Sequence, residues 1–342
     1  MSASRPVQQA GRRPTIADVA RIARVSKTTV SRVLNNKPDV DAATVHLVRT
    51  VVEGLGYVPS SSAVSLARGR AHTMGLLAPS LSAPWMLEVL RGMTEAIENT
   101  DYSLTLYTTS QGRKSFEAVQ SQLRSQVLDG LAIMQPPEAV EDLHRLYSSG
   151  VPIVVIDDRG AHRNVPSVAG TDFDGIGSAV DHLVQRGRRR LAMIAGPMHI
   201  ACHRDRLKAF EASLRSCGLT PDQSLLSVAA DDTLDAGAAA LTPLLREELP
   251  FDGLVIGNDS MALGAMRRLR EAGFDIPRDV AVTGFDDIAA AAHAEPPLTT
   301  VYNPLYEMGG TAVRLLLEAC GGEELPESTV FLPTRLVVRA ST

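Results

Sequence analysis

Short apolar runs alternate with longer amphipathic stretches along most of the chain, from Met74 onward. Seven short runs have the length and apolar character of strands buried in a parallel sheet, at residues 74–79, 103–108, 130–134, 152–156, 191–195, 253–257 and 280–284. Six stretches between them show the three- and four-residue spacing of helices, at residues 85–99, 112–127, 175–186, 203–217, 233–247 and 259–272. About 270 residues of this pattern exceed one sheet. We therefore expect two similar lobes of parallel strands, with a ligand cleft outside the carboxyl ends of the strands.

The beginning of the chain follows a purely helical pattern. Thr15 and Asp18 have the spacing of a capped helix start, and a first helix is expected from about Ile16. Ser26 can cap a second helix that runs to about Asn35, and a third begins near Asp41 and ends at the glycines of 54–56. Two short helices joined by a tight turn and covered by a third are the helix-turn-helix layout. A small basic three-helix unit with no role on DNA is the alternative.

Charge separates these two regions. The whole chain has a formal net charge of -5, but residues 1–72 contain eleven Lys and Arg against four Asp and Glu. The first segment therefore carries +7 and the remainder -12. A basic head on an acidic body indicates a polyanion-binding module joined to a second function.

The outer face of the second helix could contact that polyanion. Its inward residues would be Val30, Val33 and Leu34. The other face carries side chains able to hydrogen-bond to phosphates or base edges, namely Lys27, Thr28, Thr29, Ser31, Arg32 and Asn35.

The segment TIADVARIARVSKTTVSRVLNN, followed after a short gap by LGYVPS, resembles the DNA-binding head of the lactose/galactose repressor (LacI/GalR) family of bacterial transcriptional regulators, and the resemblance continues along almost the whole chain. It implies that Lys27 and Thr28 face base edges. Contacts to phosphates or neighbouring bases are implied for Thr15, Ser26, Thr29, Ser31, Arg32, Asn35 and Thr44. Two positions depart from the family: Arg24 replaces the usual glycine of the turn, and Val45 an arginine. We expect Arg24 to adopt the turn at modest strain.

Residues 59–71 are small, polar and rich in serine, which by composition is typical of a flexible linker. The resemblance implies instead a hinge helix that forms on DNA. Leu66 then wedges into the minor groove and Ala63 lies beside it, whereas Val64 stands where an arginine is common.

Pattern and resemblance together predict an α/β protein with an N-terminal all-α helix-turn-helix head and a two-lobed core like the periplasmic binding proteins. The head spans 15–58, after a disordered basic tail at 1–14. The core spans 72–342, with lobes of about 72–170 and 303–330, and about 171–302 and 331–342. We place the crossings between lobes near Gly170, Asn303 and Phe331.

Polar residues follow several of the predicted strands of the core. Asp157, Asn258 and Asp286 come after strands, and Arg206 opens a helix after another strand. Carboxylates and an amide accept pairs of hydroxyls while a guanidinium donates, so this set suits a polyol such as a sugar. For any single residue of this set, helix capping is the competing interpretation.

Three further residues align with effector-contacting positions of the family. Trp85, the only tryptophan, could pack its ring against a sugar, or it could belong to a core stripe with Val89 and Met93. Met86 and Asp232 also align with positions of the family's effector cleft. Asp232 stands where the family often has an aromatic residue, which implies a pocket more polar than is usual for the family.

No catalytic, metal or cofactor site is predicted. His199 and His203, with Cys202 between them, have the spacing of metal ligands on a helix, but no fourth ligand is evident. The resemblance implies instead that this stretch lines the effector cleft. No nucleophile elbow or phosphate-binding loop occurs. The arginine-rich run 186–190 is interpreted as a solvated face.

Composition limits the class of protein. With 342 residues, 44% hydrophobic and 21% charged, the chain is an ordinary globular protein. It has no long apolar run or signal peptide and only three scattered cysteines, so we expect a cytoplasmic location.

We predict a sequence-specific transcriptional repressor that binds a palindromic double-stranded operator as a homodimer and responds to a sugar-like effector, with no membrane partner. No heptad-rich tail follows the last strand, which favours a dimer over a tetramer. A sugar-binding protein without a DNA-regulatory role and a sugar-modifying enzyme are the alternatives.

Overall fold

The computed structural model describes residues 14–58, 70–109, 113–125, 127–135, 147, 150–157, 165–245 and 250–342. The chain divides into two compact units, Met1–Ala71 and His72–Thr342. Most of the expected tail and most of the expected linker, including Ala63 and Leu66, lie outside the described residues. No helix in the described part of the chain combines the length and the apolar character needed to cross a membrane.

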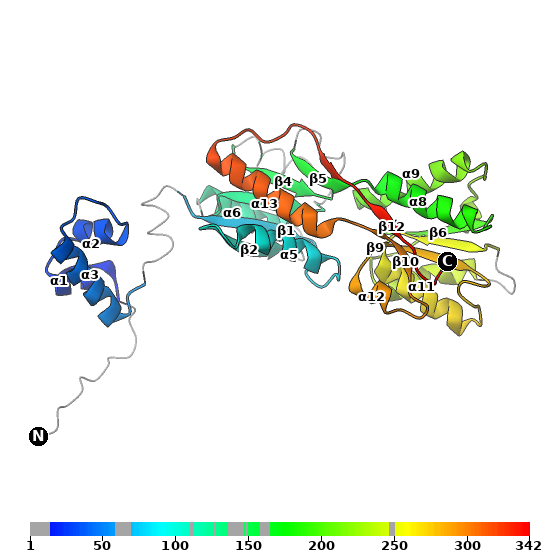
Figure 1. Ribbon diagram of the computed structural model, residues 1–342, viewed down its shortest axis with the longest axis horizontal. Helices are drawn as coiled ribbons and strands as arrows, with labels where there is room; N and C mark the ends of the chain where they lie inside the picture. Colours follow the sequence, from blue (N-terminus) through cyan, green and yellow to red (C-terminus); the bar gives the residue numbers. More distant parts are fainter. Residues whose placement is uncertain are drawn as a thin grey trace, which may run out of the picture. The chain divides into compact units, whose positions relative to one another are not determined.

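The smaller unit contains three helices, α1 (Ile16–Ala23), α2 (Lys27–Leu34) and α3 (Ala42–Leu55) (Figure 1). They start and end close to the residues that the capping and periodicity arguments predicted. Six residues form the buried core that the three helices share: Val19, Ala20, Ala23, Val30, Val33 and Val48.

Local hydrogen bonds explain where the first two helices begin and end. Asp18 accepts from both the backbone N–H (3.0 Å) and the hydroxyl (2.7 Å) of Thr15. The Ser26 hydroxyl accepts from the Thr29 backbone N–H at 3.0 Å. Between the helices, Arg24 ends α1 in the left-handed conformation, with φ 55°. The expected strained turn is therefore present, without the glycine that would adopt it freely.

The larger unit contains two six-stranded sheets (Figure 1). The first has the order β11-β5-β4-β3-β1-β2 and is parallel throughout. Its strands are β1 (Thr73–Ala78), β2 (Ser103–Thr108), β3 (Gly130–Met134), β4 (Ile153–Ile156), β5 (Ser167–Gly170) and β11 (Val330–Leu332).

The second sheet has the order β12-β10-β9-β8-β6-β7, and only β12 runs antiparallel to its neighbour. Its strands are β6 (Leu191–Ala195), β7 (Leu226–Val228), β8 (Gly253–Ile256), β9 (Ala281–Asp286), β10 (Thr299–Tyr302) and β12 (Arg335–Val337). All seven predicted strands are present. The sequence pattern missed β5, β7, β10, β11 and β12, which are only three or four residues long.

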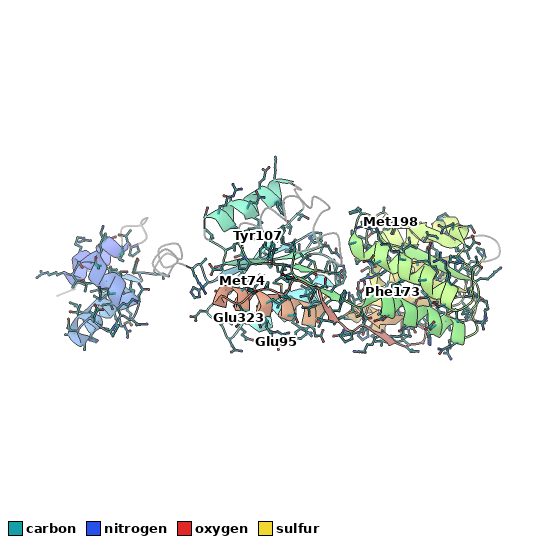
Figure 2. The ribbon with its side chains drawn as sticks, turned by 90° about the horizontal axis from the view of Figure 1, so that it is seen from above. Met74, Glu95, Tyr107, Phe173, Met198 and Glu323 are labelled. Carbon is teal, nitrogen blue, oxygen red and sulfur yellow. The ribbon has the colours of Figure 1, made fainter. Side chains whose placement is uncertain are left out.

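Helices cover both faces of each sheet. On the first sheet, α5 (Met86–Ile97) and α13 (Leu305–Gly321) pack on one face and α6 (Arg113–Arg124) on the other. On the second, α8 (Asp172–Gln185) and α9 (Ala201–Ser216) oppose α10 (Leu234–Leu241) and α11 (Asp259–Glu271), and a short α12 (Ala289–Ala292) follows β9. Seen from above, Met74 lies in the first sheet, and Phe173 and Met198 lie with the second (Figure 2). This is the predicted α/β architecture.

Three segments connect the sheets. The chain crosses after β5 at Gly170, returns after β10 at Asn303, and crosses again after β11. The third crossing was expected near Phe331, but Phe331 pairs with Ala169 inside the first sheet. The crossing therefore follows Leu332, because backbone pairing with β5 holds the chain in the first sheet for two more residues.

Candidate functional site

The start of α2 presents the polar surface of the smaller unit. Val30 and Val33 are buried against α1 and α3, whereas Lys27 and Thr28 are exposed at the first turn. Free backbone N–H groups and the positive end of the helix dipole favour phosphate at this position. The helix thus offers an ammonium and a hydroxyl to a polyanion.

The other predicted DNA-contacting residues take part in local hydrogen bonds. Ser26 caps α2, and its hydroxyl lies 2.8 Å from that of Thr29. The Asn35 amide donates to the Ser31 carbonyl at 2.8 Å, and the Thr44 backbone N–H donates to a carboxylate at 2.9 Å. These contacts position the side chains, all of which are at least partly accessible together with Thr15.

Arg32 is the exception among the cationic candidates. Its guanidinium forms an ion pair with Asp39, and Nε donates to Oδ1 at 3.1 Å. Both side chains are about half exposed. A phosphate would have to compete with Asp39, so we expect Arg32 to contribute less to DNA binding than Lys27.

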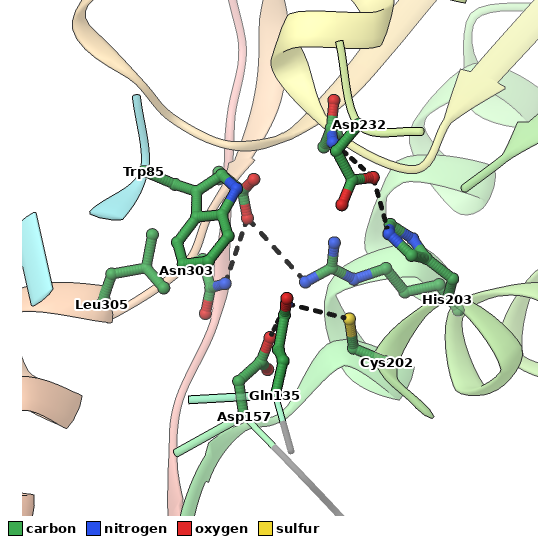
Figure 3. A pocket seen from close by; sticks show the side chains of 11 residues that line it. Trp85, Gln135, Asp157, Cys202, His203, Asp232, Asn303 and Leu305 are labelled. Carbon is green, nitrogen blue, oxygen red and sulfur yellow. Dashed lines mark hydrogen bonds and ion pairs between the residues drawn. The ribbon is translucent and has the colours of Figure 1, made fainter. Parts of the chain in front are cut away.

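In the larger unit, a cleft lies where the carboxyl ends of the strands of both sheets converge (Figure 3). Six of the seven residues predicted to contact an effector line it: Trp85, Asp157, Arg206, Asp232, Asn258 and Asp286.

Met86 is the seventh, and it is not among the lining residues. It is fully buried in the core of the first sheet, near Val89 and Met93. Consecutive helical residues point about 100° apart. Since Trp85 lines the cleft, Met86 on the next position faces the core instead.

Backbone strain is concentrated at the strand ends of this cleft. Gln135 directly follows β3, Asp157 directly follows β4, and Asp286 ends β9. Their φ angles are 45°, 59° and 108°, all in the region that side chains rarely adopt. Such strain is typical of functional sites, where the surrounding fold holds a side chain in place.

Arg206 is the cation of the cleft and is only 3% exposed. Its Nε donates to Asp172 at 2.8 Å and its Nη1 to the Gly257 carbonyl at 2.7 Å, while the guanidinium carbon lies 3.7 Å from the centre of the Phe285 ring. Burial by itself would lower the pKa of Arg206, but the neighbouring carboxylates, Asp172 foremost, raise it well above its ordinary value. The guanidinium is therefore rigidly held and charged.

Asp286 faces this guanidinium, with Oδ1 3.8 Å from Nη2, and accepts from the Asn303 amide at 3.1 Å. Burial raises the pKa of Asp286 to about 7. Arg206 and the Asn303 hydrogen bond oppose the rise, and the carboxylates of Asp157 and Asp172 add to it.

Asp232 forms the polar end of the cleft together with two residues of the second lobe. Its Oδ1 lies 2.8 Å from His203 Nε2 and accepts from the Asn258 amide at 3.0 Å. Burial alone would raise the pKa of Asp232, but its contacts with His203 and the charge of Arg206 hold it below the ordinary value. Asn258 also caps α11 through Met261, so capping and cleft lining coincide in this residue.

Trp85 belongs to the hydrophobic core and also lines the cleft, so both interpretations of its position apply. It is 7% exposed and packs in the core with Val89 and Met93. It also lines the cleft, with the ring drawn beside Asn303 and Leu305 in Figure 3. Core packing therefore holds the aromatic face at the cleft.

Five further residues line the cleft: Gln135, Cys202, His203, Asn303 and Leu305. Of these, the resemblance had pointed only to the stretch that contains Cys202 and His203. The strand-end argument that selected Asp157 applies equally to Gln135, which donates to Asp157 at 3.2 Å and to the Cys202 sulfur at 3.7 Å. Asn303 and Leu305 follow a strand that the pattern missed.

Cys202 and His203 have the spacing of metal ligands, but the resemblance implied that their stretch lines the effector cleft. In the structure His203 pairs with Asp232, and no group of three potential metal-binding side chains occurs among the described residues.

The arginine-rich run before β6 is also accounted for by the fold. The guanidiniums of Arg186, Arg188 and Arg189 donate to backbone carbonyls, at 3.0 Å from Arg186 to Thr342 and at 2.7 Å from Arg189 to Val184. Arg186, Arg189 and Arg190 are exposed, as the interpretation of a solvated face predicted, and the guanidiniums that donate to carbonyls also hold loops and the end of α8.

Comparison with known families gives two matches. The family described as bacterial regulatory proteins, lacI family, matches residues 15–60, and the periplasmic binding protein-like domain matches residues 180–342. The chain is 34% identical to the HTH-type transcriptional regulator CelR of Thermobifida fusca, covering 96% of this chain and 98% of the relative. It is 32% identical to catabolite control protein A of Priestia megaterium, covering 96% and 99%.

Solved structures of transcriptional regulators are also similar to this chain. A complex of the transcriptional regulator CelR with cellobiose has a TM-score of 0.75 at 32% identity, covering 96% of this chain and all of that one. The lac repressor dimer bound to operator and the anti-inducer ONPF has a TM-score of 0.86 at 27% identity, covering 96% and 99%.

Proposed function

This chain belongs to the lacI family of bacterial regulatory proteins and is a DNA-binding transcriptional regulator, and from this premise we propose that it is a homodimeric repressor controlled by a sugar-like effector. The repressor binds a near-palindromic operator in the cytoplasm. The effector binds in the cleft between the two sheets and alters operator affinity.

The convergence of polar side chains at the cleft carries the effector proposal. Trp85, Asp157, Arg206, Asn258 and Asp286 combine an aromatic face with carboxylate, amide and guanidinium groups. A sugar presents C–H faces to the first kind of group and hydroxyls to the others. Asp232 completes this set and Met86 is left out of it. Among the relatives, the CelR structure contains cellobiose, which supports a carbohydrate here.

The exposed start of α2 carries the operator proposal. Lys27 and Thr28 contact base edges, and the remaining polar residues of the smaller unit contact phosphates or neighbouring bases. The lac repressor structure that contains operator DNA is a dimer, which supports two-fold binding to a palindrome. The proposed phosphate or neighbouring-base contacts are Thr15, Ser26, Thr29, Ser31, Arg32, Asn35 and Thr44, with Ala63 and Leu66 in the minor groove.

Regulation follows from a shift between two conformations. Three crossings link the sheets, so a ligand that contacts both sheets favours one angle between them. A difference in operator affinity between the two angles, equivalent to about 1–3 kcal/mol, would give a useful response.

The decisive experiment selects genomic fragments that bind the purified full-length protein at a fixed, near-physiological salt concentration. We expect an enriched near-palindrome. Lys27→Ala should lower affinity for it 10- to 100-fold, because one base contact contributes about 1–3 kcal/mol, while sugar-induced changes in Trp85 fluorescence persist.

Arg215→Ala is the matched control, because it also removes one exposed positive charge, but from α9 in the larger unit. It should leave operator affinity unchanged. If only diffuse, salt-sensitive binding appeared, with and without sugars, the protein would bind sugar without regulating transcription. Turnover of a bound sugar would instead indicate an enzyme, an activity that we do not assign.

A further inference from the structure

The described residues of the cleft carry more negative than positive charge. Three carboxylates line it, those of Asp157, Asp232 and Asp286, together with the guanidinium of Arg206. That guanidinium is already neutralised from behind by Asp172, which is fully buried and does not line the cleft. Arg206 therefore organises the cleft wall and adds little net positive charge to the cleft itself.

His203 does not remove the excess of negative charge in the cleft. It is 2% exposed and contacts Asp232 through Nε2 at 2.8 Å. This contact involves only one of the three carboxylates that line the cleft. Asp157 accepts a hydrogen bond from the Gln135 amide at 3.2 Å, and Asp286 accepts one from the Asn303 amide at 3.1 Å and lies 3.8 Å from the Arg206 guanidinium.

Two groups of the cleft respond to these charges. Burial is the main reason that Asp286 has a pKa of about 7; the charge of Arg206 opposes the rise, and the charges of Asp157 and Asp172 add to it. Burial and then the charge of Asp157 likewise raise the pKa of the Cys202 thiol well above its ordinary value. A positive charge placed in the cleft would reduce the electrostatic repulsion among the cleft carboxylates, whereas a negative charge would increase it.

We propose that the effector carries a basic nitrogen, as an aminated sugar or similarly aminated polyol, and that sugars bearing phosphate or carboxylate groups are excluded. This inference rests on the proposed sugar-like effector and specifies its charge. The ammonium group lies against Asp232 and Asp286, and the remaining hydroxyls contact Asn258 and Arg206.

The first test uses two matched series of sugars on the full-length protein. One contains cellobiose, the corresponding disaccharide of glucosamine, and cellobionate. The other contains glucose, glucosamine and glucose 6-phosphate. Binding is followed by fluorescence, since Trp85 is the only tryptophan and lines the cleft. We expect the aminated member of a series to bind roughly tenfold more tightly than its neutral parent, and the anionic member not to bind.

Variants assign the effect to the cleft. Asp232→Asn should reduce affinity for the aminated sugar more than affinity for the neutral parent, so that the roughly tenfold preference for the aminated sugar is lost. Asp235→Asn is the control, because this carboxylate is three residues away, 89% exposed and paired with Arg267. It should change neither affinity. Equal or tighter binding of an anionic sugar, or weaker binding of the aminated one, would overturn the proposal.

The second test needs no ligand. At constant ionic strength, caesium should quench Trp85 more effectively than iodide, relative to free tryptophan amide, and Asp232→Asn should lower that preference roughly two-fold. A preference for iodide would overturn the inference. If no sugar bound but caesium remained preferred, the sugar-like effector would be wrong and the cation preference would stand.

Discussion

The two surfaces to which function is assigned differ in how the chain holds its polar groups. On α2, Lys27 and Thr28 are exposed at the end of a helix whose other side is buried. In the cleft, Arg206, Asn258 and Asp286 are less than a tenth exposed and contact one another or their neighbours. A large external polyanion can approach groups that remain in water, whereas a small ligand is enclosed and needs groups already oriented.

The two regions are therefore destabilised by different kinds of substitution. The cleft contains buried charges whose desolvation is offset only by mutual pairing, so the loss of one partner is costly. The smaller unit has no comparable charge network in its described core, which consists of six small or medium apolar residues. Its stability depends on those few contacts and on its turn.

Arg206→Met should have the largest effect. It leaves Asp172, which is fully buried, and Asp286 without their guanidinium. The free energy of unfolding of the larger unit should fall by about 3–5 kcal/mol, measured by chemical denaturation. Arg215→Met, 61% exposed on the same helix, should cost less than about 0.5 kcal/mol. Equal stability of the two variants would refute the buried network.

The free energy of unfolding of the larger unit should also depend on pH, with an effect smaller than that of Arg206→Met. The pKa of Asp286 is about 7 in the folded protein against 3.8 ordinarily, so folding favours its protonated form. The contribution of Asp286 to the free energy of unfolding is fully present below pH 4. It is lost as the pH rises to 7, by up to about 4 kcal/mol.

Asp286→Asn tests this dependence through denaturation midpoints measured between pH 4 and 8. The variant should flatten the decline without abolishing it, because burial also raises the pKa of Asp259 well above its ordinary value. An unchanged pH profile would show that Asp286 titrates normally.

Val30→Ala should destabilise the smaller unit by about 2 kcal/mol, since Val30 is fully buried in its core. Hydrogen exchange on the full-length protein should accelerate in peptides of α1 to α3 and remain unchanged in the larger unit. Leu47→Ala, which truncates a side chain 46% exposed on α3, is the control. Accelerated exchange in both units would mean that they do not unfold independently.

Arg24→Gly should have the smallest effect, and a stabilising one. The left-handed conformation of Arg24 strains any residue with a Cβ atom, and glycine removes that strain while losing more entropy on folding. Hydrogen exchange should slow by an amount equivalent to no more than about 1 kcal/mol. Faster exchange would indicate that the arginine side chain stabilises the turn.

Local signals in the sequence determined the smaller unit and the outline of the larger one. Thr15, Ser26 and Asp41 cap helices where predicted, and the seven apolar runs form strands of the two sheets. Capping and burial in parallel sheets act over a few residues, so residue type and spacing reveal them. The strand-end rule also selected Asp157, Asn258, Arg206 and Asp286, because parallel strands bring their carboxyl ends to one edge.

The remaining features depend on long-range packing. The pairing of β11 with β5 shifted the last crossing beyond Leu332, and the helical turn at the start of α5 placed Trp85 at the cleft and Met86 in the core. Asp232 meets His203 although 29 positions separate them in the chain. The charge of the cleft depends on Asp172 standing behind Arg206. Contacts between residues distant in sequence arise from the packing of whole helices and strands. The residue types and spacing within one segment therefore do not predict them.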